Sequence, residues 1–188
     1  MEASEALEKL KEGNKRFTEG SLTHPNQDQA ARTKWNSSQE PWAIVLSCAD
    51  SRVIPEAAFD TGVSDLFVCR VAGNVANTDT IASIEYAVAH LGTKLIVVMG
   101  HEACGAVGAA LAGGDNGYNL NILLSQIGPA IAASPNAPVS EVVKTNARLN
   151  AEEMVKRSAI ISGAVENGGL KIVSAYYNLD SGVVDFLD

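Results

Sequence analysis

Short apolar runs alternate along the chain with longer segments whose apolar residues recur at helical spacing. Four of the runs lack polar alternation, which is typical of strands that are buried on both faces of a sheet. A fifth segment, 183–187, alternates apolar and polar residues after a Gly-containing turn, which predicts a short edge strand. The four buried strands are predicted at 42–46, 65–70, 95–99 and 170–175, and the longer helices at 80–91, 103–111, 122–131 and 139–165.

Strands that alternate with helices predict an α/β fold. We expect a mostly parallel central sheet of four strands plus the short edge strand, flanked by helices. Apolar residues at helical spacing in 3–17 predict an amphipathic helix, and a second short helix is expected within 26–39, so that 1–36 forms an N-terminal helical arm. No repeat or linker interrupts the sequence, which indicates a single domain over 1–188.

The composition is globular, with 46% hydrophobic and 19% charged residues. A net charge of −8 argues against nucleic-acid and anionic-membrane partners, because both need clustered Lys and Arg. The apolar runs fall far short of the ~20 residues of a membrane span, and no basic segment followed by an apolar run opens the chain. We therefore expect a cytoplasmic protein, with organelle import or a trimmed N-terminus left open.

Two thiols and one imidazole follow two of the predicted strands. Cys48 comes after the strand at 42–46, His101 comes after the strand at 95–99, and Cys104 is expected in the first turn of the next helix. Because ligands collect at the carboxyl ends of parallel strands, the three side chains can meet in one crevice. Two thiolates and an imidazole supply three of the four ligands of a tetrahedral zinc site, and catalytic zinc keeps the fourth for water. The alternatives are chance burial and a purely structural zinc.

Asp50 and Arg52 lie beside the first thiol and are two residues apart, so in an extended turn they can form an ion pair. Such a pair on a surface contributes little. Next to a metal, the Arg can hold the Asp away from the cation and leave it free to accept a hydrogen bond from a metal-bound hydroxide. Cys69 is expected to be a small buried hydrophobe, and Glu102 a solvated carboxylate at a helix start.

Five motifs of the chain, in the same order, are similar to those of the β-class carbonic anhydrases. The opening segment 6–17 is also similar to the first helix of that family, so the match covers nearly the whole chain. This resemblance implies zinc-dependent, reversible hydration of carbon dioxide to bicarbonate and a proton, with one zinc ion per chain. The matching motifs are 47–53, 66–74, 83–88, 97–107 and 175–182.

The resemblance also implies a role for each residue of the predicted metal site. Cys48, His101 and Cys104 would bind zinc, with water, hydroxide or Asp50 as the fourth ligand. Attack would come from zinc-bound hydroxide that is oriented by Asp50 together with Arg52. The family further implies a homodimer or a larger homo-oligomer with active sites at the subunit interface, and we expect the arm 1–36 to pack on a partner subunit.

Three further residues match the carbon dioxide pocket of the plant-like branch of the family. Gln39, Phe67 and Tyr86 stand at those positions, although core packing would equally account for the two aromatic residues. Val45 stands where some bacterial members carry a Trp that helps to bind inhibitory bicarbonate, which lowers the expectation that Asp50 coordinates zinc.

Three rival functions use the same residues. Related proteins hydrolyse carbon disulfide with the same zinc shell, and a non-catalytic protein could use zinc only for stability. A thiol-redox function is disfavoured because the chain has no Cys-x-x-Cys motif.

Overall fold

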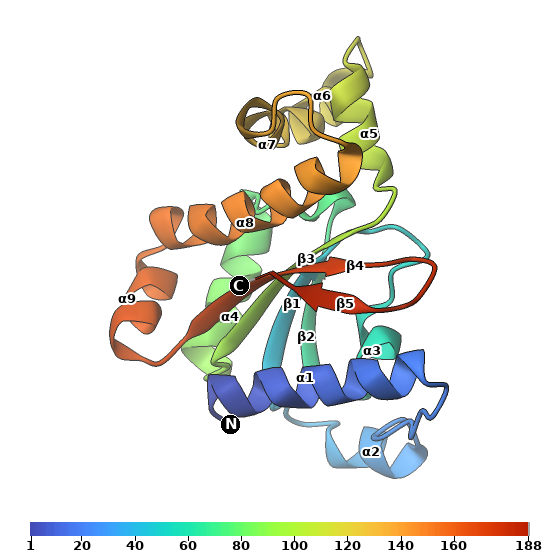
Figure 1. Ribbon diagram of the computed structural model, residues 1–188. Coiled ribbons are helices and arrows are strands. Elements are labelled where there is room, and N and C mark those ends of the chain that lie inside the picture. The colour runs from blue at the N-terminus through green and yellow to red at the C-terminus, as the bar shows by residue number, and fades with distance from the viewer. Residues whose placement is uncertain (188) are drawn as a thin grey trace.

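The computed structural model describes residues 1–187, which form a five-stranded sheet with helices on both faces (Figure 1). The strand order is β2-β1-β3-β4-β5. The first four strands are parallel and β5 pairs antiparallel with β4 at one edge, so the predicted fold class is confirmed. The strands are β1 (Ala43–Ser47), β2 (Leu66–Arg70), β3 (Leu95–His101), β4 (Lys171–Tyr177) and β5 (Val184–Phe186).

The two central strands, β1 and β3, are buried along their whole length, which explains their unbroken apolar sequences. From β1 the chain moves outward to β2, whereas from β3 it moves in the opposite direction to β4. The carboxyl ends of β1 and β3 therefore flank the point at which the strand order reverses. In open α/β sheets this is the position where ligands bind.

Helices cover the two faces of the sheet with separate apolar cores. On one face, α1 (Ala3–Thr18) packs Ala6, Leu7 and Leu10 against the sheet, beside α3 (Pro55–Ala58). On the other face lie α4 (Thr78–Leu91), α8 (Val139–Arg157) and α9 (Ala159–Asn167), and Figure 1 shows the sheet between α1 and α8. The first helix of the arm thus packs on its own chain, and its contact with a partner subunit stays a prediction.

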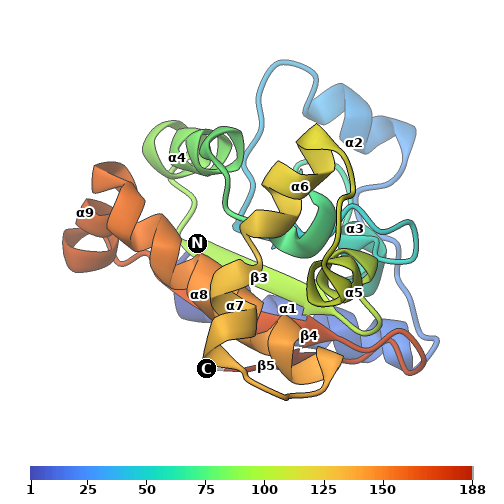
Figure 2. The ribbon, with the colours of Figure 1, turned by 90° about the horizontal axis from the view of Figure 1, so that it is seen from above.

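Two of the expected long helices are each divided into two. The segment expected as 139–165 breaks at Ser158, whose backbone is extended and whose side chain accepts a hydrogen bond from the Ile161 N–H at the start of α9. The segment expected as 122–131 forms α6 (Tyr118–Ser125) and α7 (Gly128–Ala133), and Pro129 stands in the first turn of α7. Seen from above, α7 lies beside α8 (Figure 2).

The remaining elements are short or lie beside the metal centre. The helix expected at 103–111 is α5 (Gly105–Ala112), and the second helix of the arm is α2 (Gln29–Lys34). Two elements were not predicted: α3 and the single turn η1 (Ala72–Asn74) that follows β2. Between residues 1 and 187, no helix combines the length and the apolar content that crossing a bilayer requires.

Candidate metal centre

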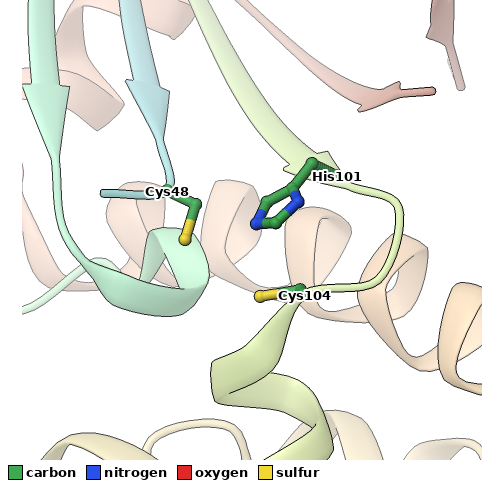
Figure 3. Close-up of side chains that lie close together, drawn as sticks. All are labelled: Cys48, His101 and Cys104. Carbon is green, nitrogen blue, oxygen red and sulfur yellow. The ribbon is translucent and has the colours of Figure 1, made fainter. Parts of the chain in front are cut away.

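Cys48, His101 and Cys104 lie together at the carboxyl ends of β1 and β3 (Figure 3). Cys48 directly follows β1, His101 is the last residue of β3, and Cys104 is the N-cap of α5. Cys104 therefore precedes the first turn of the helix in which it was expected. All three side chains are buried, and their ligand atoms lie within 4.8 Å of one another.

The imidazole of His101 is held with one nitrogen directed toward the two sulfurs. The carbonyl oxygen of Glu102 lies 2.8 Å from Nδ1 and can only accept, so Nδ1 carries the proton and Nε2 has the free lone pair. Nε2 is buried and has no hydrogen-bond partner in the part of the chain that the structure describes. A buried polar atom without a partner is costly, and a bound cation would satisfy it.

The two thiols have opposite tendencies to ionise. The hydrogen bond from the Cys104 thiol lowers the pKa of Cys48 despite its burial, and the Gly73 N–H, 3.3 Å from Cys48 Sγ, acts in the same direction. The same bond with Cys48, together with burial, raises the pKa of Cys104. One thiolate forms readily, whereas the second needs a nearby positive charge. Two thiolates and a neutral imidazole are a donor set that zinc prefers, so the residues present fit this ion.

At the edge of this cluster, the Asp50 carboxylate accepts three hydrogen bonds from Arg52. Arg52 Nε and the backbone N–H of Arg52 each donate to Oδ1 at 2.9 Å, and Arg52 Nη2 donates to Oδ2 at 2.8 Å. The predicted pairing is confirmed. The side-chain bonds from Arg52, followed by its backbone N–H, hold the pKa of Asp50 well below its usual range. Asp50 Oδ2 lies 3.9 Å from His101 Nε2, so the carboxylate borders the cluster while facing the guanidinium.

Arg70, at the end of β2, also supports the loop that carries Cys48 and Asp50. Its Nε donates to the Cys48 carbonyl oxygen at 3.0 Å, and its Nη2 donates to the Asp50 carbonyl oxygen at 2.6 Å. Arg70 was not among the residues predicted from the sequence. Its position at the carboxyl end of a predicted strand was the one feature of the sequence that could have indicated it. In the parallel pairing of β1 and β2, Arg70 lies beside Ser47 and so reaches the loop that follows β1.

Glu102 does not extend freely into solvent. Its carboxylate accepts a hydrogen bond from the Leu179 N–H at 3.0 Å, and its own N–H donates to the Tyr177 carbonyl oxygen at 2.9 Å. Glu102 thus ties the loop after His101 to the turn between β4 and β5.

Gln39, Phe67 and Tyr86 line surface cavities to which the three metal-site residues do not contribute. Gln39 and Tyr86 line a surface cavity of about 660 Å³, and the rings of Phe67 and Tyr86 are 6.5 Å apart between centroids. Phe67 lines a neighbouring cavity, and neither cavity is lined by Cys48, His101 or Cys104. Tyr86 is 48% exposed, which weighs against core packing as its role. The substrate-binding role of these three residues stays a prediction.

Fold and site together define a class of protein: a parallel α/β protein with a Cys-His-Cys metal centre at its switch point and an Arg-bound carboxylate beside it. The sequence profile of the carbonic anhydrase family matches residues 43–184. The chain belongs to this family, and its fold is that of the β class.

Individual relatives match over most of their length. Carbonic anhydrase 2 of Mycobacterium tuberculosis is 39% identical over 184 residues, which cover 94% of this chain and 89% of the relative. A carbonic anhydrase of Mycolicibacterium smegmatis is 37% identical over 187 residues, which cover 96% of this chain and 91% of the relative.

Solved structures agree with this assignment. A β-carbonic anhydrase of the fungal pathogen Aspergillus fumigatus matches with a TM-score of 0.73 at 29% identity, covering 98% of this chain and 90% of that chain. One of two tetrameric β-carbonic anhydrases from Sordaria macrospora matches with a TM-score of 0.72 at 28% identity, covering 82% of this chain and 84% of that chain.

Proposed function

We propose that this protein is a carbonic anhydrase that binds one zinc ion per chain through Cys48, His101 and Cys104. The reaction is the reversible hydration of carbon dioxide to bicarbonate and a proton. One observation carries the proposal: the buried, unpartnered Nε2 of His101 faces two thiols beside a carboxylate that Arg52 already holds. The membership of the family supplies the reaction.

The chain's own residues define how the site works. When bound, zinc supplies the Lewis acidity that makes a water molecule nucleophilic near neutral pH. Asp50 is ionised and borders the ligands, so it can accept a hydrogen bond from that nucleophile and orient its lone pair toward carbon dioxide. Through bonds to both carboxylate oxygens, Arg52 would keep Asp50 from turning onto a bound cation. This geometry favours a solvent molecule over Asp50 as the fourth ligand.

We further propose that the protein acts as a homodimer or a larger homo-oligomer in the cytoplasm. Two observations support assembly. The relatives from Sordaria macrospora are described as tetrameric. Tyr86 is half exposed in a cavity without metal ligands, so a second chain would be needed to bring it and Phe67 to a zinc centre. Gln39, Phe67 and Tyr86 would then form the carbon dioxide pocket.

Substituting Asp50→Asn tests the function, because the amide cannot replace the ionised acceptor. We expect the rate of carbon dioxide hydration, measured by stopped flow with a pH indicator, to fall about 100-fold or more while zinc content and fold are kept. Asp28→Asn is the matched control: Asp28 is an exposed N-cap of α2, and Asn caps a helix equally well, so the rate should not change.

Two outcomes would contradict the proposal. A zinc-loaded Asp50→Asn protein with the wild-type rate would indicate that the metal serves only stability. Hydrolysis of carbon disulfide by the wild-type preparation, without hydration of carbon dioxide, would assign the other reaction to the same site.

A further inference from the structure

We propose that Asn146 and Asn150 of α8 are positioning residues that press the Gly73 N–H against the Cys48 sulfur. Through this contact, α8 would control how tightly Cys48 holds the metal. The inference rests on the proposed function, since it assigns a supporting role around the same zinc ligand. It concerns two side chains that none of the sequence motifs contains.

The contact is made by a turn with an unusual backbone. Gly73 and Asn74, in η1, have φ angles of +71° and +45°, and this geometry directs the Gly73 N–H at Cys48 Sγ over 3.3 Å. A Cβ on Gly73 would lie 2.9 Å from Ile127 Cδ1, so the end of the Ile127 side chain would have to shift to admit one. The left-handed conformation at Asn74 is unfavourable for a non-glycine residue and has to be imposed by the surroundings.

Asn74 does not stabilise this turn with its own side chain. The residue is 1% exposed, and neither Oδ1 nor Nδ2 has a hydrogen-bond partner among the residues that the structure describes. A local side-chain bond, the usual reason for Asn in this conformation, is therefore missing. Besides the turn's own backbone bond, from the Asn74 N–H to the Val71 carbonyl oxygen at 2.9 Å, the turn is held by bonds from another element.

That element is α8, which binds the turn on both sides of Asn74. Asn146 Nδ2 donates to the Gly73 carbonyl oxygen at 2.8 Å, and Asn150 Oδ1 accepts from the Ala76 N–H at 2.6 Å. Asn150 Nδ2 donates to Asn146 Oδ1 at 3.1 Å and to the Asn146 carbonyl oxygen at 2.8 Å, so the two amides form one network.

Burial makes this network strong. Asn146 is 1% exposed and Asn150 is 8% exposed, and on the same side of α8 they alternate with the buried apolar residues Val143, Ala147 and Met154. Hydrogen bonds in such surroundings are electrostatically stronger than in water, and the loss of one partner leaves the other unsatisfied. The two buried amides therefore fix one specific contact with the turn, whose Gly73 N–H faces the Cys48 sulfur.

An N–H donor to a metal thiolate has chemical consequences. It withdraws electron density from sulfur and fixes the direction of its lone pairs, as outer-shell partners do for other ligands. Asn146 holds the carbonyl that follows the Gly73 α-carbon, and the N–H that faces sulfur precedes it, so Asn146 acts by fixing the φ and ψ angles of Gly73. Without Asn146 these angles can relax, and the N–H can then move away from the sulfur. We expect zinc to be held less tightly because the sulfur is no longer fixed in position, an effect that outweighs the increase in its electron donation.

The first experiment uses the wild-type protein loaded with ¹¹³Cd. The Gly73 amide proton should show a scalar coupling to cadmium through the sulfur, detected by NMR. Its absence in a cadmium-loaded protein would overturn the inference, and this result does not depend on whether any variant folds.

The second experiment compares Asn146→Ala with Asn14→Ala. Asn14 is also a buried asparagine that donates to two backbone carbonyls, those of Ala58 and Gly182, but it lies on the other face of the sheet. Asn146→Ala should bind zinc about 10-fold more weakly in a competition with a chelator, and Asn14→Ala should not. In the cobalt-substituted protein, the sulfur-to-cobalt charge-transfer band should move to longer wavelength only in Asn146→Ala.

The variant Asn150→Ala keeps the bond from Asn146 to Gly73 but removes the acceptor for the Ala76 N–H and the donor to Asn146. It should show a smaller change in the same direction. Equal weakening in Asn14→Ala and Asn146→Ala would overturn the inference, because the effect would then reflect general destabilisation, as would unchanged zinc affinity and cobalt spectrum in Asn146→Ala. A wild-type protein that binds no zinc would overturn the proposed function as well, so the two failures are distinguishable.

Discussion

Single buried polar side chains join parts of this molecule that the sheet and helix ladders do not connect. Asn14 links α1 to the carbonyl oxygens of Ala58 and Gly182, and Asn146 links α8 to that of Gly73. Each bond satisfies a buried backbone group that would otherwise lose its contact with water. A substitution at such a position therefore lowers the free energy of unfolding, and the loss grows with the number of buried polar groups that are left without partners.

Asp60 is a buried side chain that links separate segments through its negative charge as well as through hydrogen bonds. Its side chain is fully buried, and it accepts hydrogen bonds from Arg16 Nε at 2.6 Å, from the Thr23 N–H and hydroxyl, and from the His24 N–H. Burial alone would raise the pKa of Asp60, but the bonds from Arg16, Thr23 and His24 outweigh it and hold that pKa well below its usual range.

This lowered pKa predicts a pH-dependent contribution to stability. The unfolded chain takes up the proton more readily than the native state, so the contribution is complete above the unfolded pKa of about 4 and is lost as pH falls below it. Asp60→Asn should lower the unfolding free energy at pH 7 by about 2 kcal/mol and by less at pH 3. Urea unfolding at both pH values measures this. A variant with the same deficit at pH 3 and pH 7 would contradict it.

At this scale the sequence predicted the groups whose chemistry is visible in their type and spacing. Cys48, His101 and Cys104 were found because they follow apolar runs, and the Asp50–Arg52 pair because the two residues are neighbours. Arg70, Gly73 and Asn146 were not found. Their contacts depend on strand register, on a left-handed turn and on the packing of α8, and a single sequence encodes none of these locally.

At the scale of elements, the close approach of α1 to α3 depends on one helical glycine. A Cβ on Gly13 would lie 1.9 Å from the Phe59 carbonyl oxygen and 2.7 Å from the Phe59 carbonyl carbon. Backbone cannot move aside as a flexible side chain can. This contact brings the first helix against the segment that leads from the metal-binding loop to β2.

Gly13→Ala should therefore destabilise the protein, although alanine normally favours a helix over glycine by about 1 kcal/mol. The overpacking penalty is about 1–3 kcal/mol for a well-packed site and is larger against backbone, so we expect a net loss of roughly 2 kcal/mol. Gly163→Ala in α9 is the control, since its Cβ would meet nothing within 4 Å and should stabilise slightly. Thermal unfolding of both variants tests this. Equal effects would contradict the steric argument.

Element types were predicted better than element ends. Unbroken apolar runs identify β1 and β3 because both faces of these strands are buried, a property that their sequences express directly. The division of 139–165 was missed because Ser158 falls within a periodic pattern and acts through its extended backbone and its cap on α9. The turn η1 was missed because its shape is held by α8, from 70 or more residues away.

At the scale of the whole molecule, the candidate zinc ligands connect the two halves of the switch point. Cys48 follows β1, whereas His101 and Cys104 lie 53 and 56 residues further along. A cation bound by all three would cross-link segments that are otherwise joined through strand pairing and packing. Metal bound only by the native state stabilises it by mass action.

Removal of zinc should therefore lower global stability. With free zinc at about 1,000 times its dissociation constant, linkage gives about 4 kcal/mol, which excess chelator should abolish. Urea unfolding with and without chelator measures the difference. The Cys104→Ala protein is the control, because it lacks one ligand and chelator should change its stability much less. An unchanged unfolding midpoint in wild-type protein after complete zinc loss would contradict the expectation.

The order of the residues along the chain also sets the order in which the metal centre is completed during synthesis. All three ligands have been synthesised by residue 104, as have β1, β2 and β3. The asparagines that brace the Gly73 turn follow some 40 residues later, and β4, beside β3, comes later still. A nascent chain can thus bind zinc before Asn146 and Asn150 have been synthesised. The metal would then be bound first by a loose shell and retained by a tighter one.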